Sequence, residues 1–208
     1  MSDPQKKLLK ALIVGKPNVG KSTLLNHLVG EKVSIVSRKA QTTQRNTTGV
    51  VTKDNSQLIF FDTPGLNKIE KNIRISETFK TVAENVDVLI YMVDNTKKSQ
   101  SIDDQFRNWL NNNENKFIKK ILIINKIDCI EKVNLFEITK KINSVINFDE
   151  TFFISLSKKS GMERFLNWVE KQAYSNEWLF QQTYKSNISK KNFLSELTRE
   201  KVFEYIHE

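Results

Sequence analysis

The sequence predicts an α/β fold, with a mainly parallel six-stranded sheet flanked by helices on both faces. Short apolar runs alternate with longer segments of helical spacing, a pattern typical of parallel strands joined by crossover helices. Most of these runs are apolar throughout, as expected of strands that are buried on both faces. The predicted strands are 11–14, 47–52, 58–61, 88–93, 121–124 and 152–154.

The helices and the one edge strand follow from local composition. Strand 47–52, TTGVVT, is rich in β-branched residues and precedes the polar turn KDNS, so we expect it at an edge of the sheet. The segments between the strands place apolar residues at helical spacing. The predicted helices are 21–29, 74–86, 103–110, 135–146 and 162–173.

The alternation of strands and helices stops near residue 175. Residues 175–188 are expected to form a linker or an extended connection. Ser189 is a candidate N-cap for an amphipathic helix that places Phe193, Leu194 and Leu197 on a partly apolar face. A lone helix needs a surface to pack on. It therefore either docks back or belongs to a domain that is incomplete in this chain.

Composition narrows the class of protein. Of the 208 residues, 38% are hydrophobic and 27% are charged, which is typical of a soluble globular protein. We find neither a transmembrane stretch nor a signal peptide and expect a cytoplasmic protein. The single cysteine, Cys129, excludes an intrachain disulfide and is expected to be buried or half-buried. His27 and His207 lack the spacing of metal ligands.

The net charge of +9 has two possible interpretations. It favours contact with a polyanion, of which RNA is the obvious candidate in the cytoplasm. A general bias toward surface lysine gives the same charge without any partner, and the sequence leaves both readings open.

The stretch GKPNVGKS at 15–22 follows the first predicted strand and fits the pattern G-x-x-x-x-G-K-[ST]. Gly15 and Gly20 permit a wrapped loop whose backbone N–H groups point at phosphate oxygens. Lys21 is suited to bridge β- and γ-phosphates, and the Ser22 hydroxyl to bind Mg²⁺. An ordinary glycine-rich turn has the same local pattern, but the strand–loop–helix context favours phosphate binding.

Two further motifs follow strands. In DTPG, at 62–65, Asp62 is suited to hold Mg²⁺, and the Gly65 N–H to sense a γ-phosphate, although a type I turn has the same shape. In NKID, at 125–128, Asp128 is suited to accept hydrogen bonds from guanine N1–H and the exocyclic amine, which adenine cannot offer. Asn125 would brace this loop, and the stem of Lys126 would lie along the base.

The three motifs together, with RKAQTTQR at 38–45 and FISLSKKSG at 153–161, resemble the Era family of bacterial ribosome-assembly GTPases. The resemblance extends over residues 8–206. It implies a P-loop GTPase domain over 1–175. The tail KKNFLSELTREKVFEYI is similar to the first helix of the family's KH-type RNA-binding domain. The resemblance thus implies that 176–208 are a linker and a C-terminal helix from an incomplete second domain.

The resemblance also implies roles for individual residues. Thr43, with its neighbour Thr42 as the alternative, would bind Mg²⁺ in the GTP state, together with Ser22 and Asp62. The backbone N–H groups of Ser155 and Leu156 would face the base O6, although the family has Ala at position 156. The implied contacts to GTP or GDP are made by Gly15, Asn18, Val19, Gly20, Lys21, Ser22, Thr23, Asp62, Gly65, Asn125, Lys126, Asp128, Ser155 and Leu156.

Hydrolysis would rest on Lys21, Thr43, Gly65 and Asn18. Leu66 stands where Ras-like enzymes carry a water-orienting glutamine, so we expect slow intrinsic hydrolysis. Relatives with asparagine at the Asn18 position can use K⁺ as an added cation, so faster hydrolysis in K⁺ than in Na⁺ is expected.

The implied function is a GTP-hydrolysing switch in assembly of the small ribosomal subunit, with 16S rRNA as partner. Peripheral association with the inner membrane is an option that the resemblance leaves open. No two of the six glycines lie three apart, so the GXXG loop of a KH domain is missing and RNA contact is expected to be weaker. Two alternatives stay open: a non-catalytic nucleotide-gated ribosome- or RNA-binding module, and a related tRNA-modification GTPase.

Overall fold

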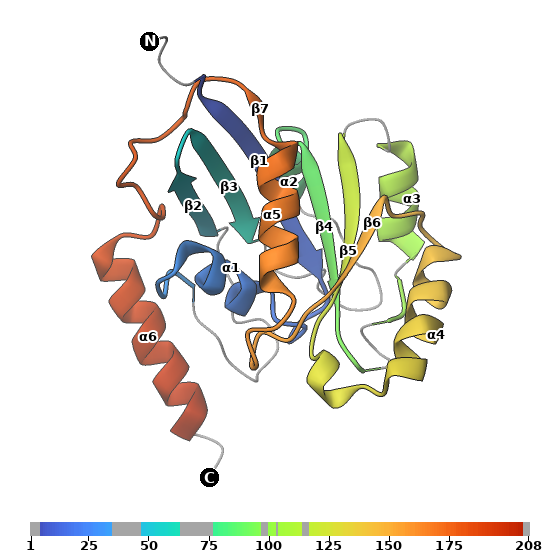
Figure 1. Ribbon diagram of the computed structural model, residues 1–208. Helices are drawn as coiled ribbons and strands as arrows, with labels where there is room; N and C mark the ends of the chain where they lie inside the picture. The colour runs from blue at the N-terminus through green and yellow to red at the C-terminus, as the bar shows by residue number, and fades with distance from the viewer. Residues whose placement is uncertain are drawn as a thin grey trace.

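In the computed structural model, the strands lie in the order β2-β3-β1-β4-β5-β6 (Figure 1). The structure describes residues 5–34, 47–62, 77–96, 100–102, 104–113 and 117–205. All six predicted strands are present. They are β1 (Lys7–Gly15), β2 (Thr47–Lys53), β3 (Ser56–Asp62), β4 (Val88–Val93), β5 (Lys119–Ile124) and β6 (Glu150–Phe153).

The sheet is mainly parallel, as predicted. Strand β1 pairs in parallel with β3 and β4, and the series continues in parallel through β5 to β6. Only β2 among these six runs antiparallel, against β3. A seventh strand, β7 (Tyr174–Ser175), pairs antiparallel with the start of β1. The sequence did not predict β7 because two exposed residues carry no apolar pattern.

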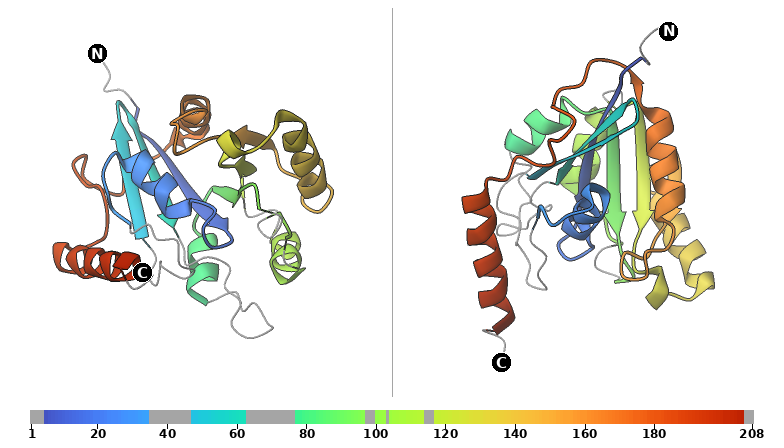
Figure 2. Two further views of the ribbon diagram at one scale, coloured as in Figure 1. Left: turned by 90° about the horizontal axis from the view of Figure 1, so that it is seen from below. Right: turned by 60° about the vertical axis from the view of Figure 1, so that its left-hand side comes forward.

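Helices cover both faces of the sheet, and Figure 2 shows α5 and α2 on opposite sides of it. The helices are α1 (Lys21–Val29), α2 (Glu77–Ala83), α3 (Asp104–Asn112), α4 (Lys132–Asn143) and α5 (Met162–Gln172). Side chains of α1 and α5 share one buried cluster with the sheet, and side chains of α2, α3 and α4 share the other. The predicted two-faced arrangement is confirmed.

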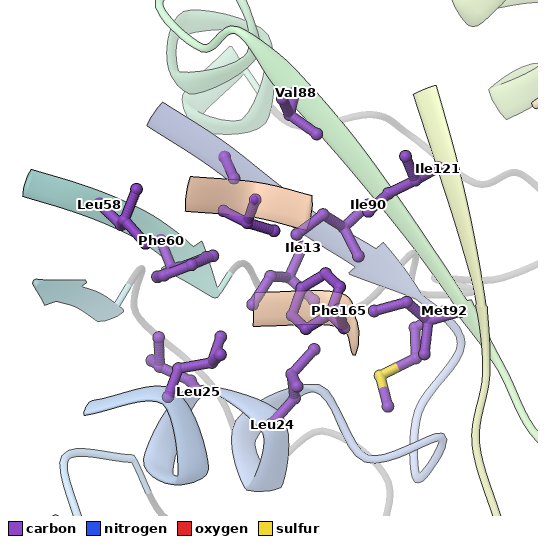
Figure 3. Close-up of a cluster of buried hydrophobic side chains, with 14 of the residues drawn as sticks. Ile13, Leu24, Leu25, Leu58, Phe60, Val88, Ile90, Met92, Ile121 and Phe165 are labelled. Carbon is purple, nitrogen blue, oxygen red and sulfur yellow. The ribbon is translucent and has the colours of Figure 1, made fainter. Parts of the chain in front are cut away.

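The cluster under α1 and α5 supports the loop between β1 and α1. Figure 3 shows Leu24 and Leu25 of α1 and Phe165 of α5 pointing toward Ile13 and Phe60 of the sheet. All five side chains are fully buried. Each stabilises the fold by roughly 1.5–3 kcal/mol through burial of apolar surface. This packing fixes the first turn of α1 against the end of β1.

The parallel pairing brings the carboxyl ends of four strands to one edge. In register, Ile13 lies beside Asp62 of β3, Gly15 beside Met92 of β4, and Val93 beside Ile124 of β5. The segments that follow these strands must therefore meet. In a parallel α/β sheet this edge is where ligands bind.

Residues after β7 run along the outer edge of the sheet, past β2 (Figure 1). Gly49 of β2 forms an antiparallel bridge with Ser186, and the Val50 N–H donates to the Lys185 carbonyl at 2.8 Å. The rings of Phe180 and Tyr184 stack at 4.5 Å and cover the small apolar cluster of Leu8, Val50 and Ile59. The connection is thus extended, as expected, and its residues 185 and 186 pair with the edge strand β2.

The side chain of buried Gln57 fastens this connection. Its Oε1 accepts hydrogen bonds from the backbone N–H groups of Leu179 and Phe180 at 2.9 and 3.1 Å. Its Nε2 donates to the Phe180 carbonyl at 2.9 Å and to Thr52 Oγ1 at 3.2 Å. Three of these four hydrogen bonds therefore hold residues 179–180, and the fourth goes to Thr52 of β2.

The last described helix, α6 (Lys190–Tyr205), begins after Ser189. Ser189 Oγ accepts from the Asn192 N–H at 3.2 Å, which confirms the predicted N-cap. Phe193 and Leu197 are half-buried, whereas Leu194, Val202 and Tyr205 are exposed. The division of the chain at residues 175 and 176 stays a prediction.

One expectation about burial is wrong. Cys129 is exposed, because it lies in the 3-10 turn Ile127–Cys129 beyond the end of β5 rather than against the sheet. Across the described ranges, every helix is too short or too polar to cross a membrane.

Candidate functional site

The loop between β1 and α1 depends on two glycines. Gly20 has φ +108°, and a Cβ there would lie 2.5 Å from Asn125 Nδ2. Gly15 has φ +152°, and a Cβ there would lie 2.3 Å from the Met92 carbonyl oxygen. A side chain at either position would collide with the neighbouring strand end. The loop can adopt this conformation only because both residues are glycine.

Lys21 reaches back into this loop. Its Nζ donates to the carbonyls of Gly15 and Lys16, both at 2.9 Å, and the residue is 7% exposed. Burial lowers the pKa of the Lys21 ammonium, and the negative charge of Asp62 opposes that shift. The Lys21 side chain is therefore held at the centre of the loop by its two carbonyl partners.

Asp62, the last residue of β3, contacts the first turn of α1 beside Lys21. Its Oδ2 accepts from Ser22 Oγ at 2.6 Å and from Ser34 Oγ at 3.4 Å. Complete burial raises the pKa of the Asp62 carboxyl, while the charge of Lys21 and the two serine bonds lower it. Its other oxygen, Oδ1, is buried and has no hydrogen-bond partner among the described residues. Buried carboxylate and hydroxyl oxygens are ligands that suit Mg²⁺.

Residues Val33 and Ser34, which follow α1, are held by the side chain of Asn26. Asn26 Oδ1 accepts from the backbone N–H groups of Val33 and Ser34, each at 2.8 Å. Its Nδ2 donates to the Ser34 carbonyl at 2.7 Å. The sequence analysis did not identify Asn26 and Ser34. A single amide inside a helix does not reveal that it will bond the backbone of residues 33 and 34.

Asn125 joins two loops. Its Nδ2 donates to the Val19 carbonyl at 2.9 Å, and its Oδ1 accepts from the Leu156 N–H at 3.3 Å. The side chain is buried, so both bonds are shielded from water. The Leu156 side chain belongs to the cluster beneath α1 and α5, so the larger residue is accommodated at this position.

Asp128 presents an oriented carboxylate at the surface. Ser155 Oγ donates to Oδ1 at 2.5 Å, and Ser157 Oγ donates to Oδ2 at 3.1 Å. The bond from Ser155 is the main cause of a lowered pKa at Asp128, with a smaller contribution from Ser157. The carboxylate is thus ionised near neutral pH and is positioned by the loop at 155–157. Sequence reasoning did not assign Ser157.

Lys126 extends between the loops that contain Asn18 and Asp94. Its Nζ donates to the Asn18 carbonyl at 2.9 Å and to Asp94 Oδ2 at 2.6 Å. Asn18 and Lys126 both have positive φ, at 66° and 61°. Sequence reasoning missed Asp94, although it follows the buried strand β4 as Asp62 follows the apolar run of β3.

The structure brings most of the sequence-predicted residues to one edge of the sheet. The connected set is Gly15, Asn18, Val19, Gly20, Lys21, Ser22, Asp62, Asn125, Lys126, Asp128, Ser155 and Leu156. Thr23 lies in the first turn of α1 and is half-buried. Thr43, Gly65 and Leu66 lie outside the described residues. Over the ranges that are described, no group of three or more His, Cys, Asp or Glu side chains is arranged to hold a metal.

Comparison with known families gives a match over residues 10–126 to a model described as 50S ribosome-binding GTPase. Among curated proteins, GTPase Era of Sinorhizobium medicae is 32% identical over 200 residues, covering 94% of this chain and 63% of that protein. GTPase Era of Trichlorobacter lovleyi is 34% identical over 215 residues, covering 98% of this chain and 68% of that protein. The chain thus spans about two thirds of the length of these relatives.

Among solved structures, the fold matches Era in complex with MgGDPNP and nucleotides 1506–1542 of 16S ribosomal RNA. The TM-score is 0.78 at 33% identity, over 94% of this chain and 67% of that one. A point variant of Aquifex aeolicus Era, bound to GDP.AlF4⁻, gives the same TM-score and identity over 66% of its chain.

Proposed function

This chain belongs to the Era family of GTPases, and on that premise we propose that it binds GTP and GDP and hydrolyses GTP as a molecular switch. The observation that carries the proposal is the bond from Asn125 to the Val19 carbonyl. This bond joins the loop that is proposed to bind the phosphates, residues 15–22, to the loop that is proposed to bind the base, residues 125–128. One nucleotide placed along this sheet edge would contact both.

The phosphate end of the proposed site is the loop from Gly15 to Ser22. A ligand phosphate would take the place of the carbonyls that Lys21 now contacts. The exchange is favourable because a charge-assisted bond to a phosphate is stronger than a bond to a neutral carbonyl. The N-terminus of α1 adds backbone N–H donors and a favourable helix dipole.

The base end is read by Asp128. Two carboxylate oxygens, already held by Ser155 and Ser157, face solvent with lone pairs to spare. Guanine offers N1–H and the 2-amine as two adjacent donors to such a group, whereas adenine offers an acceptor and no amine. A site built for those donors rejects a base that lacks them, because the carboxylate would lose its partners. The N–H groups of Ser155 and Leu156 are the proposed donors to the base O6, and each would exchange a present acceptor, the Ser160 carbonyl and Asn125 Oδ1 respectively, for the base.

The oxygens at Ser22 and Asp62 fit Mg²⁺. Asp62 Oδ1 supports this, because it is buried without a partner in the part of the chain that the structure describes, and a buried carboxylate oxygen is costly unless something binds it. When bound, Mg²⁺ supplies positive charge against the β- and γ-phosphate oxygens. Thr43 is the proposed third protein ligand in the GTP state.

Hydrolysis is proposed to depend on electrostatic positioning by this chain. Lys21 would neutralise charge on the phosphates, and Gly65 would sense the γ-phosphate through its N–H. Leu66 cannot hydrogen-bond a water molecule, so slow intrinsic turnover is expected. Asn18 is the proposed residue for a K⁺ ion that would add a second cation.

The proposed partner is 16S rRNA of the small ribosomal subunit, and the proposed location is the cytoplasm, with the inner membrane as a peripheral site. Support comes from the relative that was crystallised with MgGDPNP and 16S ribosomal RNA. The net charge of +9 also favours a polyanionic partner.

The test is to measure the affinity of the purified chain for GDP, GTP and ATP with Mg²⁺, followed by steady-state phosphate release in K⁺ and in Na⁺. Guanine-selective binding with repeated turnover is the expected result. Selective binding without turnover would favour the alternative, a nucleotide-gated binding module, which the leucine at position 66 also favours. Equal affinity for ATP would overturn the proposed function.

A further inference from the structure

We propose that Asp94 is a positioning residue that holds Lys126 across the gap between the phosphate-binding loop and the base-reading loop. The inference rests on the proposed function, because it concerns how that nucleotide site is prepared before a nucleotide arrives. It assigns to Asp94 no contact with the nucleotide.

Asp94 lies in the middle of the row of strand carboxyl ends at which the proposed site is formed. It follows β4, which lies in the sheet between β1 and β5, the strands that lead into the two loops. The backbone beside it already connects to the base-reading loop, because the Asn125 N–H donates to the Val93 carbonyl at 2.8 Å. A side chain at position 94 therefore lies within reach of both loops.

Both oxygens of the Asp94 carboxylate are used. Oδ1 accepts from the Thr96 N–H at 3.0 Å and from Thr96 Oγ1 at 2.6 Å. Oδ2 accepts from Lys126 Nζ at 2.6 Å. Because Thr96 fixes one oxygen, the other points in a single direction, toward Lys126. The carboxylate is a fixed anchor and not a flexible counter-ion.

Burial separates this ion pair from an ordinary surface pair. The Asp94 side chain is 3% exposed, while that of Lys126 is 40% exposed. An exposed pair contributes little, because water and salt screen it. A buried carboxylate must keep its partner, because losing it would leave an uncompensated charge. The lysine is thus tied at its charged end by a buried partner, while its side chain as a whole is 40% exposed.

The consequence is pre-organisation of Lys126. Its ammonium is held by two partners, Asp94 and the Asn18 carbonyl, so its stem is already stretched between the base loop and the phosphate loop. A free lysine would lose rotamer freedom when a nucleotide bound against it. Here that loss has occurred before binding, and affinity rises by the amount that is no longer lost.

A double-mutant cycle on the full chain tests this role. The variants are Asp94→Asn, Lys126→Met and both together, with Asp104→Asn as the matched control. Asp104 forms an exposed pair with Arg107 on α3, at 80% and 41% side-chain exposure, and takes no part in the site. The readouts are affinity for GDP and for IDP, whose base lacks the 2-amine, together with thermal unfolding.

We expect Asp94→Asn to weaken GDP binding about tenfold, the size of one lost charge-assisted bond. In the Lys126→Met background the same change should have almost no further effect, because the side chain that it positions is gone. The ratio of GDP to IDP affinity should stay the same, because Asp128 still reads the 2-amine. Asp104→Asn should match the parent chain.

Additive effects of the two substitutions on affinity would overturn the role of Asp94, as would a changed ratio of GDP to IDP affinity. If Asp94→Asn unfolds the chain, Thr96→Val takes its place in the cycle, because it removes the shorter of the two bonds that orient the carboxylate without removing its charge. Its weakening of GDP binding must also vanish beside Lys126→Met. A parent chain that binds no guanine nucleotide would instead overturn the proposed function itself.

Discussion

Ser22 Oγ donates a 2.6 Å hydrogen bond to Oδ2 of Asp62, although the two residues lie 40 positions apart in the chain. The bond joins the first turn of α1 to the end of β3, with the Lys21 ammonium nearby. Burial lowers the pKa of Lys21 and raises that of Asp62, and each charge partly offsets the shift of the other. The corner therefore combines a buried lysine, a buried carboxylate and a serine hydroxyl.

Replacing Lys21 with alanine tests the phosphate end. The substitution removes the cation at the centre of the loop, and GDP and GTP should each bind about 10- to 100-fold more weakly, the range expected for one charge-assisted hydrogen bond. Isothermal titration calorimetry measures the change. Lys53→Ala is the control, because Lys53 pairs with Glu170 on the surface of β2 and α5. Unchanged affinity in Lys21→Ala would count against the assignment of the loop.

Replacing Gly20 with alanine tests the contact between the two loops. The new Cβ would lie 2.5 Å from Asn125 Nδ2 at φ +108°, so the free energy of unfolding should fall by roughly 2 kcal/mol or more. Gly30→Ala is the matched control, because Gly30 has φ +79° but nothing within 4 Å of its Cβ position. That variant should lose only about 1 kcal/mol. Equal losses in urea unfolding would show that the two loops are not in contact.

Replacing Gln57 with leucine tests the connection at the sheet edge. The apolar leucine side chain would leave the N–H groups of Leu179 and Phe180 without their acceptor, so unfolding should become easier by about 2–4 kcal/mol. Amide hydrogen exchange should also accelerate in residues 179–186. The exposed Gln181 offers the control Gln181→Leu, which should change neither quantity. Unaltered exchange in Gln57→Leu would mean that the clamp does not hold the segment.

The hydroxyl of Ser155 is predicted to set the pKa of Asp128. That pKa is lowered mainly by the Ser155 bond from an ordinary value of 3.8, so the folded chain keeps this carboxylate ionised to lower pH than the unfolded chain does. The resulting stability is present above the ordinary value and is lost as the pH falls through the lowered pKa. Ser155→Ala should therefore raise the pKa toward 3.8, as followed by carbon-detected NMR of the carboxyl group.

The control for that titration is Ser144→Ala, whose hydroxyl donates to the Lys141 carbonyl on α4. It should leave the Asp128 titration where it is in the parent chain. A pKa that stays put or falls in Ser155→Ala would contradict the assigned cause.

Strands and helices whose apolar residues follow a periodic pattern could be predicted from the sequence. Segments that are held in place mainly by hydrogen bonds could not. Five of the six strands predicted from the sequence follow from buried apolar runs such as 88–93, because burial on both faces demands them, and the edge strand 47–52 follows from its β-branched composition. Strand β7 and residues 179–186 are held by Gln57 and by backbone pairing, which leave no periodic trace in the sequence. The extended connection was expected, but its attachment to β2 was not.

Within the site, the residues of the three motifs could be predicted from the sequence. The residues that hydrogen-bond to them and hold them in place could be predicted only in part. Asp94 gives the same signal as Asp62, a carboxylate directly after a buried apolar run, and that signal could have found it. Asn26 and Ser157 give none, because their partners are backbone groups or residues that only the fold brings near. Cys129 was expected to be at least half-buried because it follows β5 closely, but the 3-10 turn carries it to the surface.

The central claim is that Asp128 reads guanine, and the most direct measurement is the affinity of parent and Asp128→Asn chains for GDP and XDP. Xanthine has an oxygen in place of the 2-amine of guanine, so it suits the amide donor of asparagine and repels a carboxylate. The parent should prefer GDP, and Asp128→Asn should prefer XDP, with a change of about 100-fold or more in the ratio of the two affinities. A variant that keeps the parent's preference for GDP would contradict the assignment of this carboxylate as the guanine reader.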